Sequence, residues 1–147
     1  MLTCTFEDGG EGKLRHAVAQ AVVVKNDQIL LEKRAETLLE GGKWALPGGY
    51  VDHNETIEQA ITREIREETG WEITNLKLLS IFDNPDRPND AGRQNIAFNY
   101  ACEATEQTGE LDWEVSEIQW FNIADLPPPD TIAFDHYMVI QQYIADV

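Results

Sequence analysis

The sequence is poor in cysteine and in basic residues, and it has no long hydrophobic run. Two cysteines, Cys4 and Cys102, are too few for a disulfide framework or a cysteine-rich zinc site. The longest clear apolar run, around residues 21–24, is far shorter than the ~20 residues of a membrane-spanning helix. The first residues also lack the basic and then apolar segments of a secretory signal. We therefore expect a cytoplasmic protein with no membrane partner.

The scarcity of basic residues leaves the chain strongly acidic. Lys and Arg number 11 against 27 Asp and Glu, so the formal net charge is −16. This charge repels nucleic-acid backbones and anionic membranes, and we expect no nucleic-acid partner. If the protein handles phosphates, it needs divalent cations between its carboxylates and the substrate. The alternative explanation is that the negative charge serves only to keep the protein soluble.

The length and composition fit one folded domain. A chain of 147 residues, 42% of them hydrophobic and 26% charged, can bury a core without disulfides or a structural metal. Residues 1–14 are polar and glycine-rich, and we expect a flexible N-terminal arm followed by a single domain over residues 15–147. Sequence patterns predict strands over residues 16–25, 28–34, 44–46, 50–51, 72–82, 95–104 and 117–122, and helices over residues 56–69 and from residue 135 onward. This order favours an α/β fold with a mixed sheet between helical layers.

The helix expected over residues 56–69 carries an unusual acidic stripe. A capping box of Thr56 with Gln59 begins it, and Gly70 ends it. Like charges three or four residues apart repel, and carboxylates are unfavourable at a helix C-terminus. A divalent cation would relieve both effects, because Mg²⁺ and Mn²⁺ prefer carboxylate oxygens. The alternative is a solvent-exposed acidic face that pairs with Arg63 and Arg66. At ~100° per residue, the core-facing stripe comprises Ile57, Ala60, Ile61, Glu64, Glu67 and Glu68.

A longer motif contains this helix. It runs glycine, five residues, glutamate, seven residues, and then Arg-Glu-apolar-x-Glu-Glu-x-Gly-apolar. The pattern resembles the Nudix box, and its fixed positions are all matched, by Gly49, Glu55, Arg63, Glu64, Glu67, Glu68 and Gly70, with Trp71 at the last apolar position. The segments at residues 44–49 and 117–121 are also similar to the family, so the resemblance spans residues 16–126.

The resemblance implies a three-layer α/β/α sandwich around a mixed sheet. It also implies hydrolysis of a nucleoside diphosphate linked to another moiety. Carried over by position, Glu64, Glu67 and Glu68 bind Mg²⁺ or Mn²⁺, and the backbone carbonyl of Gly49 is a further ligand. Arg63 orients the acidic residues, and a homodimer is common among relatives. Two more box residues, Glu55 and Gly70, are expected to hold the box in its loop–helix–loop conformation.

The resemblance leaves the catalytic base open. The mechanism needs a carboxylate that removes a proton from the attacking water. The base is either a box glutamate, such as Glu67, or a glutamate on a later loop. Glu114 and Glu117 are the later candidates, and we favour Glu117 because it precedes an aromatic pair at a family-like distance. The predicted catalytic set is therefore Arg63, Glu64, Glu67 and Glu117.

The loop over residues 83–93 indicates a substrate class. A proline in a Pro-x-Arg context about fifteen residues after the box resembles the ADP-ribose pyrophosphatase branch of the family. Arg87 and Arg93 are predicted to contact phosphate, which suits guanidinium geometry, and Tyr50 to stack on a base. For the two arginines the alternative is surface ion pairing, and for the tyrosine it is a place in the core. The expected products are a nucleoside monophosphate and a sugar phosphate.

Two other functions stay open at this point. One is a nucleoside-triphosphate pyrophosphohydrolase of the type that removes oxidised nucleotides, since its specificity lies in a pocket that the sequence does not reveal. The other is a non-catalytic Nudix-fold nucleotide sensor. Such modules usually lack box carboxylates, and this chain has them all, which favours an enzyme.

Overall fold

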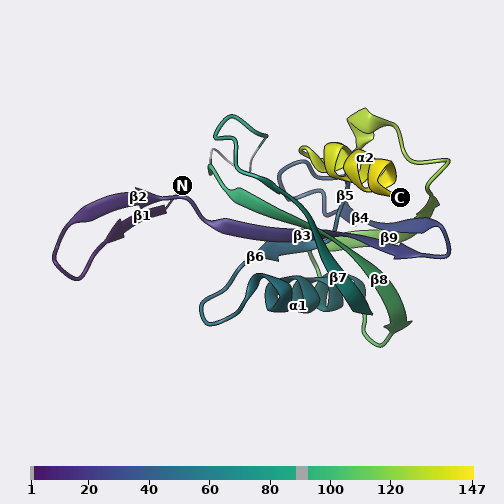
Figure 1. Ribbon diagram of the computed structural model, residues 1–147, viewed down its shortest axis with the longest axis horizontal. Coiled ribbons are helices and arrows are strands. Elements are labelled where there is room, and N and C mark those ends of the chain that lie inside the picture. Colours follow the sequence, from purple (N-terminus) through teal and green to yellow (C-terminus); the bar gives the residue numbers. More distant parts are fainter. Residues whose placement is uncertain (1, 89–92) are drawn as a thin grey trace.

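The computed structural model describes residues 2–88 and 93–147, and most of them belong to a mixed sheet with a helix on each face (Figure 1). No helix among these residues is long and apolar enough to cross a membrane. In chain order the elements are β1 (Leu2–Thr5), β2 (Glu11–Leu14), β3 (Ala17–Lys25), β4 (Gln28–Arg34), β5 (Trp44–Ala45), β6 (Gly48–Tyr50), α1 (Ile57–Thr69), β7 (Trp71–Phe82), β8 (Ile96–Gln107), β9 (Val115–Asn122), the 3-10 helix η2 (Pro129–Thr131) and α2 (His136–Asp146).

The main sheet has seven strands within the described residues. Its central path runs β5-β4-β3-β8-β7, while β6 pairs with β3 and β9 pairs with β4. The β3–β8 pair is parallel and the other pairs are antiparallel, so the sheet is mixed, as predicted. Each predicted strand overlaps an observed one, but β6 lies at Gly48–Tyr50 and shares only Tyr50 with the predicted residues 50–51. β8 ends three residues later than predicted, and β9 begins two residues earlier.

Two hydrophobic clusters, one on each face of the sheet, hold the three layers together. Strand side chains alternate between faces, so successive residues of β3 contribute to different clusters. Ala21 and Val23 pack with α1, whereas Val22 packs with Ile29 of β4 and Ile140 of α2. Helix α1 therefore covers one face and α2 the other, which confirms the predicted α/β/α sandwich (Figure 1).

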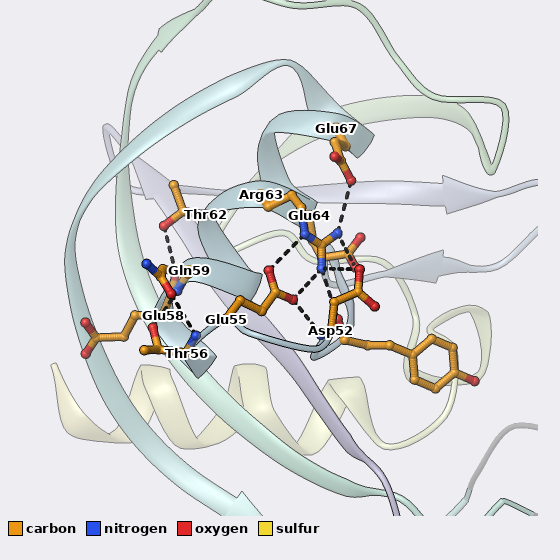
Figure 2. Close-up of polar contacts among 10 residues, drawn as sticks. Asp52, Glu55, Thr56, Glu58, Gln59, Thr62, Arg63, Glu64 and Glu67 are labelled. Atoms are coloured by element: carbon orange, nitrogen blue, oxygen red, sulfur yellow. Dashed lines mark hydrogen bonds and ion pairs between the residues drawn. The ribbon is translucent and has the colours of Figure 1, made fainter. Parts of the chain in front are cut away.

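The ends of α1 are fixed by the residues that the sequence indicates. Thr56 Oγ1 accepts from the Gln59 N–H at 3.2 Å, and Gln59 Oε1 accepts from the Thr56 N–H at 2.8 Å, which completes the capping box (Figure 2). Gly70 ends the helix with φ at 71°, and a Cβ there would lie 2.3 Å from the carbonyl oxygen of Gly109. Only glycine fits this position without strain.

The N-terminal segment differs from the irregular arm that its composition suggests. β1 and β2 form an antiparallel hairpin that is separate from the main sheet (Figure 1). The reason is a local pattern that composition hides: Thr3 and Thr5 are β-branched residues suited to a strand, and Gly9 adopts the turn with φ at +83°. The flexibility of this segment and the domain boundary at residue 15 stay predictions.

Candidate active site

An arginine at the centre of α1 organises the loop between β6 and α1. Arg63 donates to both oxygens of Glu55, at 2.7 and 3.1 Å, and to the backbone carbonyl of Tyr50 at 3.1 Å (Figure 2). Glu55 also accepts the N–H of Asp52 at 2.6 Å. The hydrogen bonds from Arg63 and then from Asp52 hold the pKa of Glu55 below its usual value, so this pair stays charged. The loop is therefore tied to the helix.

The other side of the same guanidinium contacts two acidic residues of the helix. Arg63 Nη1 lies 2.9 Å from Glu64 Oε1 and 3.1 Å from Glu67 Oε2 (Figure 2). Hydrogen bonding to Glu55, and then to these glutamates, raises the pKa of Arg63, which keeps it protonated. The predicted role of Arg63, orienting the acidic residues, agrees with this geometry.

A second carboxylate group lies deeper, where α1 meets the sheet. Glu68 Oε2 accepts the N–H of Gly48 at 2.8 Å, and its carboxyl group shares a hydrogen bond with Glu32 of β4. Glu32 is 3% exposed and Glu68 8%. Burial raises the pKa of both groups, that of Glu32 to about 8, and burial also raises the pKa of half-buried Glu64. Acids that crowd in a buried place retain protons that isolated carboxyls lose.

Two glycines of β6 lie where a side chain would not fit. A Cβ on Gly49 would lie 2.5 Å from Glu64 Oε1, so any side chain there would displace that carboxylate. Gly48 has φ at +147°, and a Cβ on it would lie 2.2 Å from the carbonyl oxygen of Ala19. The backbone of β6 therefore approaches Glu64 at Gly49, and strand β3 at Gly48, more closely than any other residue type would allow.

The donor set fits a hard divalent cation, although the side chains are not arranged as a finished metal cage. Within the described ranges, no group of three or more His, Cys, Asp and Glu is placed to hold an ion. Glu32 Oε2, however, is buried and has no hydrogen-bond partner in the described part of the chain. Two further carboxyl groups with raised pKa values, those of Glu64 and Glu68, act on the same residue. A cation would replace the retained protons and satisfy that oxygen.

A pocket of about 380 Å³ opens beside these carboxylates. Its wall includes Glu64 and Glu68, the two β6 glycines, Phe134 just before α2, and His136, the first residue of α2. A wider hollow of about 920 Å³ follows the outer side of α1 and includes Glu67. Neither Glu64 nor Glu68 lines that hollow, so the smaller pocket is the candidate active site.

The structure separates some predicted residues from this site. The helical wheel placed Glu67 with the core-facing residues, but its side chain is 54% exposed, because it lies at the edge of the stripe and turns toward Arg63. Glu117 pairs with Lys33, 3.9 Å away, across the β9–β4 register. Lys33 lies on the opposite face of β4 from Glu32. Glu117 is therefore not among the residues that line the pocket, whereas Glu114 is, and the identity of the base stays a prediction.

The predicted substrate-binding residues have different surroundings. Arg87 lines the pocket, but its guanidinium is buried and donates to Asp135 at 2.6 and 2.7 Å and to Asn95. These contacts indicate a structural role and leave few N–H groups for a phosphate. Arg93 lies over the ring of Tyr50 and donates to its hydroxyl group, and both residues line the pocket.

Sequence reasoning missed Glu32, Asp135 and His136. The signal for Glu32 is a lone acid in a strand of buried residues, two positions after Leu30 and on the same face. Asp135 and His136 are 5% and 7% exposed, but nothing in the sequence distinguishes them from ordinary helix-start residues.

Comparisons with known proteins agree on one family. The model of the NUDIX domain matches residues 14–143. Over 132 residues the chain is 34% identical to an ADP-ribose pyrophosphatase of Methanocaldococcus jannaschii, covering 89% of this chain and 75% of that protein. The chain is also 33% identical to the NAD-capped RNA hydrolase NudC of Vibrio cholerae. That alignment covers 85% of this chain but only 44% of NudC.

Solved structures give the same result. The NUDIX domain of Shewanella oneidensis NrtR, complexed with ADP ribose, is similar with a TM-score of 0.76 at 26% identity, covering 92% of this chain and 90% of that one. The MutT NUDIX hydrolase of Burkholderia pseudomallei is similar with a TM-score of 0.69 at 30% identity, covering 88% of this chain and 98% of that one.

Proposed function

This chain belongs to the NUDIX family and is a pyrophosphate-hydrolysing enzyme, and we propose that its substrate is ADP-ribose or a related nucleoside diphosphate sugar. The products would be a nucleoside monophosphate and a sugar phosphate. The observation that carries the proposal is the convergence of Glu64 and Glu68 on the β6 glycines at the wall of one pocket, with Glu32 buried against Glu68. Two similar proteins, the M. jannaschii pyrophosphatase and the NrtR domain, are associated with ADP-ribose by name.

The proposal includes a bound divalent cation. Nudix hydrolases generally need a divalent metal ion, and we assign Mg²⁺ or Mn²⁺ because the candidate ligands are oxygens. Glu64, Glu67, Glu68 and the carbonyl of Gly49 are the ligands that the box predicts, and burial of Glu32 against Glu68 adds it to the set. When bound, such an ion neutralises diphosphate oxygens and makes a coordinated water more acidic.

The remaining roles follow from the residues around the pocket. Arg93 is the candidate phosphate contact, since a guanidinium pairs with phosphate oxygens in fixed geometry. Tyr50, beside it, offers a ring for stacking on a base. We propose Glu114, which lines the pocket, as the base that accepts the proton of the attacking water as the water oxygen bonds to phosphorus and the phosphate leaving group departs. Glu67 stays the alternative base. Arg63 and Glu55 keep the loop before α1 in position.

A substrate panel tests this function. ADP-ribose, other nucleoside diphosphate sugars, dinucleotides and nucleoside triphosphates are incubated with the enzyme in Mg²⁺ or in EDTA, and the products are separated by chromatography. We expect AMP and ribose phosphate from ADP-ribose, and no product in EDTA. Turnover of a deoxynucleoside triphosphate without turnover of any diphosphate sugar would establish the oxidised-nucleotide alternative. Absence of all turnover, with nucleotide binding retained, would establish a sensor.

A pair of matched variants controls the panel. Glu68→Gln removes a buried carboxylate beside Gly48 and should abolish most turnover while the far-UV circular dichroism spectrum stays unchanged. Glu117→Gln makes the same chemical change at an exposed position on the other face of the sheet and should retain full activity. A cytoplasmic location and a homodimeric state, both expected from the sequence, are also part of this proposal.

A further inference from the structure

His136 lies in the wall of the candidate active site and has no role in the chemistry described so far. Its Nδ1 accepts a hydrogen bond of 2.9 Å from the backbone N–H of Leu46, and the residue is almost fully buried. A ring nitrogen that accepts a hydrogen bond carries no proton, so the single proton of the neutral imidazole is on Nε2. Nε2 has no hydrogen-bond partner within residues 2–88 and 93–147.

The surroundings keep this ring uncharged. Burial lowers the pKa of His136 to about 4. The neighbouring carboxylate of Asp135 acts in the opposite direction, but both of its oxygens accept hydrogen bonds from Arg87. The positive charges of Arg34 and Arg87 favour the neutral ring further. At neutral pH the pocket wall therefore carries a fixed, uncharged N–H donor.

We propose that His136 Nε2 donates a hydrogen bond to an acceptor atom on the uncharged part of the substrate, its base or its ribose. This inference rests on the proposed function of the same pocket. In the proposed function, the anionic pyrophosphate interacts with a cation held by the carboxylates and with Arg93. The uncharged N–H donor of His136 therefore suits the uncharged part of the substrate.

The neighbours of His136 in the pocket fit a base or sugar. Gln20 is a neutral amide that is almost fully buried, and its side chain is held by a hydrogen bond of 2.8 Å to Asn99. The ring of Phe134 lies 5.5 Å from that of His136, centroid to centroid, and the Arg34 guanidinium lies over the Phe134 ring at 5.2 Å from its centroid. An aromatic ring beside a few fixed polar groups is a usual composition of small-molecule binding sites, and the neutral groups at this place suit the uncharged part of the substrate.

Two substitutions separate the proposed contact from the structural hydrogen bond. In His136→Asn the amide oxygen takes the place of Nδ1, so the bond from Leu46 is kept while the outer donor is lost. In His136→Gln the longer side chain carries an amide N–H to the region of Nε2, so the donor is kept while the bond from Leu46 is lost. Thermal unfolding shows that each variant is folded before its kinetics are measured.

We expect His136→Asn to raise KM about 3- to 10-fold with little change in kcat, because one hydrogen bond is lost equally from the bound and transition states. His136→Gln should keep KM closer to that of the wild type but unfold at a lower temperature. An unchanged KM in His136→Asn overturns the proposal. Equal increases of KM in both variants, with equal losses of stability, also overturn it and assign His136 to the fold alone.

The kinetic comparison uses whichever nucleotide of the panel the wild type cleaves, so a wrong substrate assignment is recognised separately by the wild type's lack of ADP-ribose turnover. AMP and ribose 5-phosphate, titrated calorimetrically, locate the acceptor. Weaker binding of AMP to His136→Asn places it on the nucleoside, and weaker binding of ribose 5-phosphate places it on the second sugar. If neither affinity changes, the donor contacts neither part and the proposal fails.

Discussion

Replacing Glu32 by glutamine should stabilise the metal-free protein at alkaline pH. Burial raises the pKa of Glu32 from 4.5 to about 8. An acid whose pKa is higher in the folded state resists ionisation there, so folding is penalised whenever the unfolded chain would be ionised. The penalty is absent below about pH 4.5, grows between pH 4.5 and about 8, and is complete above that.

The size of this penalty follows from the difference in pKa. A difference of about 3.5 pH units at about 1.4 kcal/mol for each unit corresponds to an upper limit of about 5 kcal/mol. Glu68 shares the proton of the pair, so the part that belongs to Glu32 alone is smaller. For a protein of this length each kcal/mol changes Tm by about 2–4 °C. A glutamine of the same shape should therefore raise Tm at pH 8.5, by at most about 10–20 °C.

The assay is thermal unfolding from pH 5 to pH 9 in EDTA. The wild type should lose stability as the pH rises through this range, and Glu32→Gln should show a much flatter profile. Glu117→Gln is the matched control, and its Tm should follow the wild type because exposed ion pairs contribute little. Added Mg²⁺ should restore the wild type at pH 8.5 more than Glu32→Gln. Parallel pH profiles of Glu32→Gln and wild type in EDTA would refute the reasoning.

Three further substitutions test the assigned roles. Glu114→Gln should lower kcat about a hundredfold, because it removes the proposed base. Glu117→Gln should leave kcat within twofold of the wild type. A kcat of Glu114→Gln equal to that of the wild type in steady-state assays would reject Glu114 as the base. Gly49→Ala places a methyl group 2.5 Å from Glu64 Oε1, so activity should need a higher Mg²⁺ concentration; an unchanged metal titration would contradict this contact. Arg63→Lys loses the two parallel hydrogen bonds to the carboxylate of Glu55, so both kcat and Tm should fall. Wild-type values of both kcat and Tm would show that these two hydrogen bonds are dispensable.

The sequence by itself determined the helices and the approximate positions of the main-sheet strands, together with the identity of the acidic helix, but not the β1–β2 hairpin. Capping residues, a period of 3.6 and strand alternation act over a few neighbouring residues, and these signals are legible in one chain. They located α1 from Thr56 to Gly70 within a residue at either end. The complete set of box residues also identified the family, because it records positions at fixed spacing along the chain.

Only the tertiary structure decided which side chains meet. Glu32 is 36 residues from Glu68 along the chain, and Arg87 is 48 residues from Asp135, so no local pattern connects either pair. Sheet register brings Glu32 to the face of α1 and turns Glu117 to the other face. Register and helix packing are fixed by the burial of whole faces, which depends on every element at once. For that reason the sequence predicted which helix carries the acidic residues. Only the fold showed that Glu32 is the buried partner of Glu68 and that His136 is the neutral donor in the pocket wall.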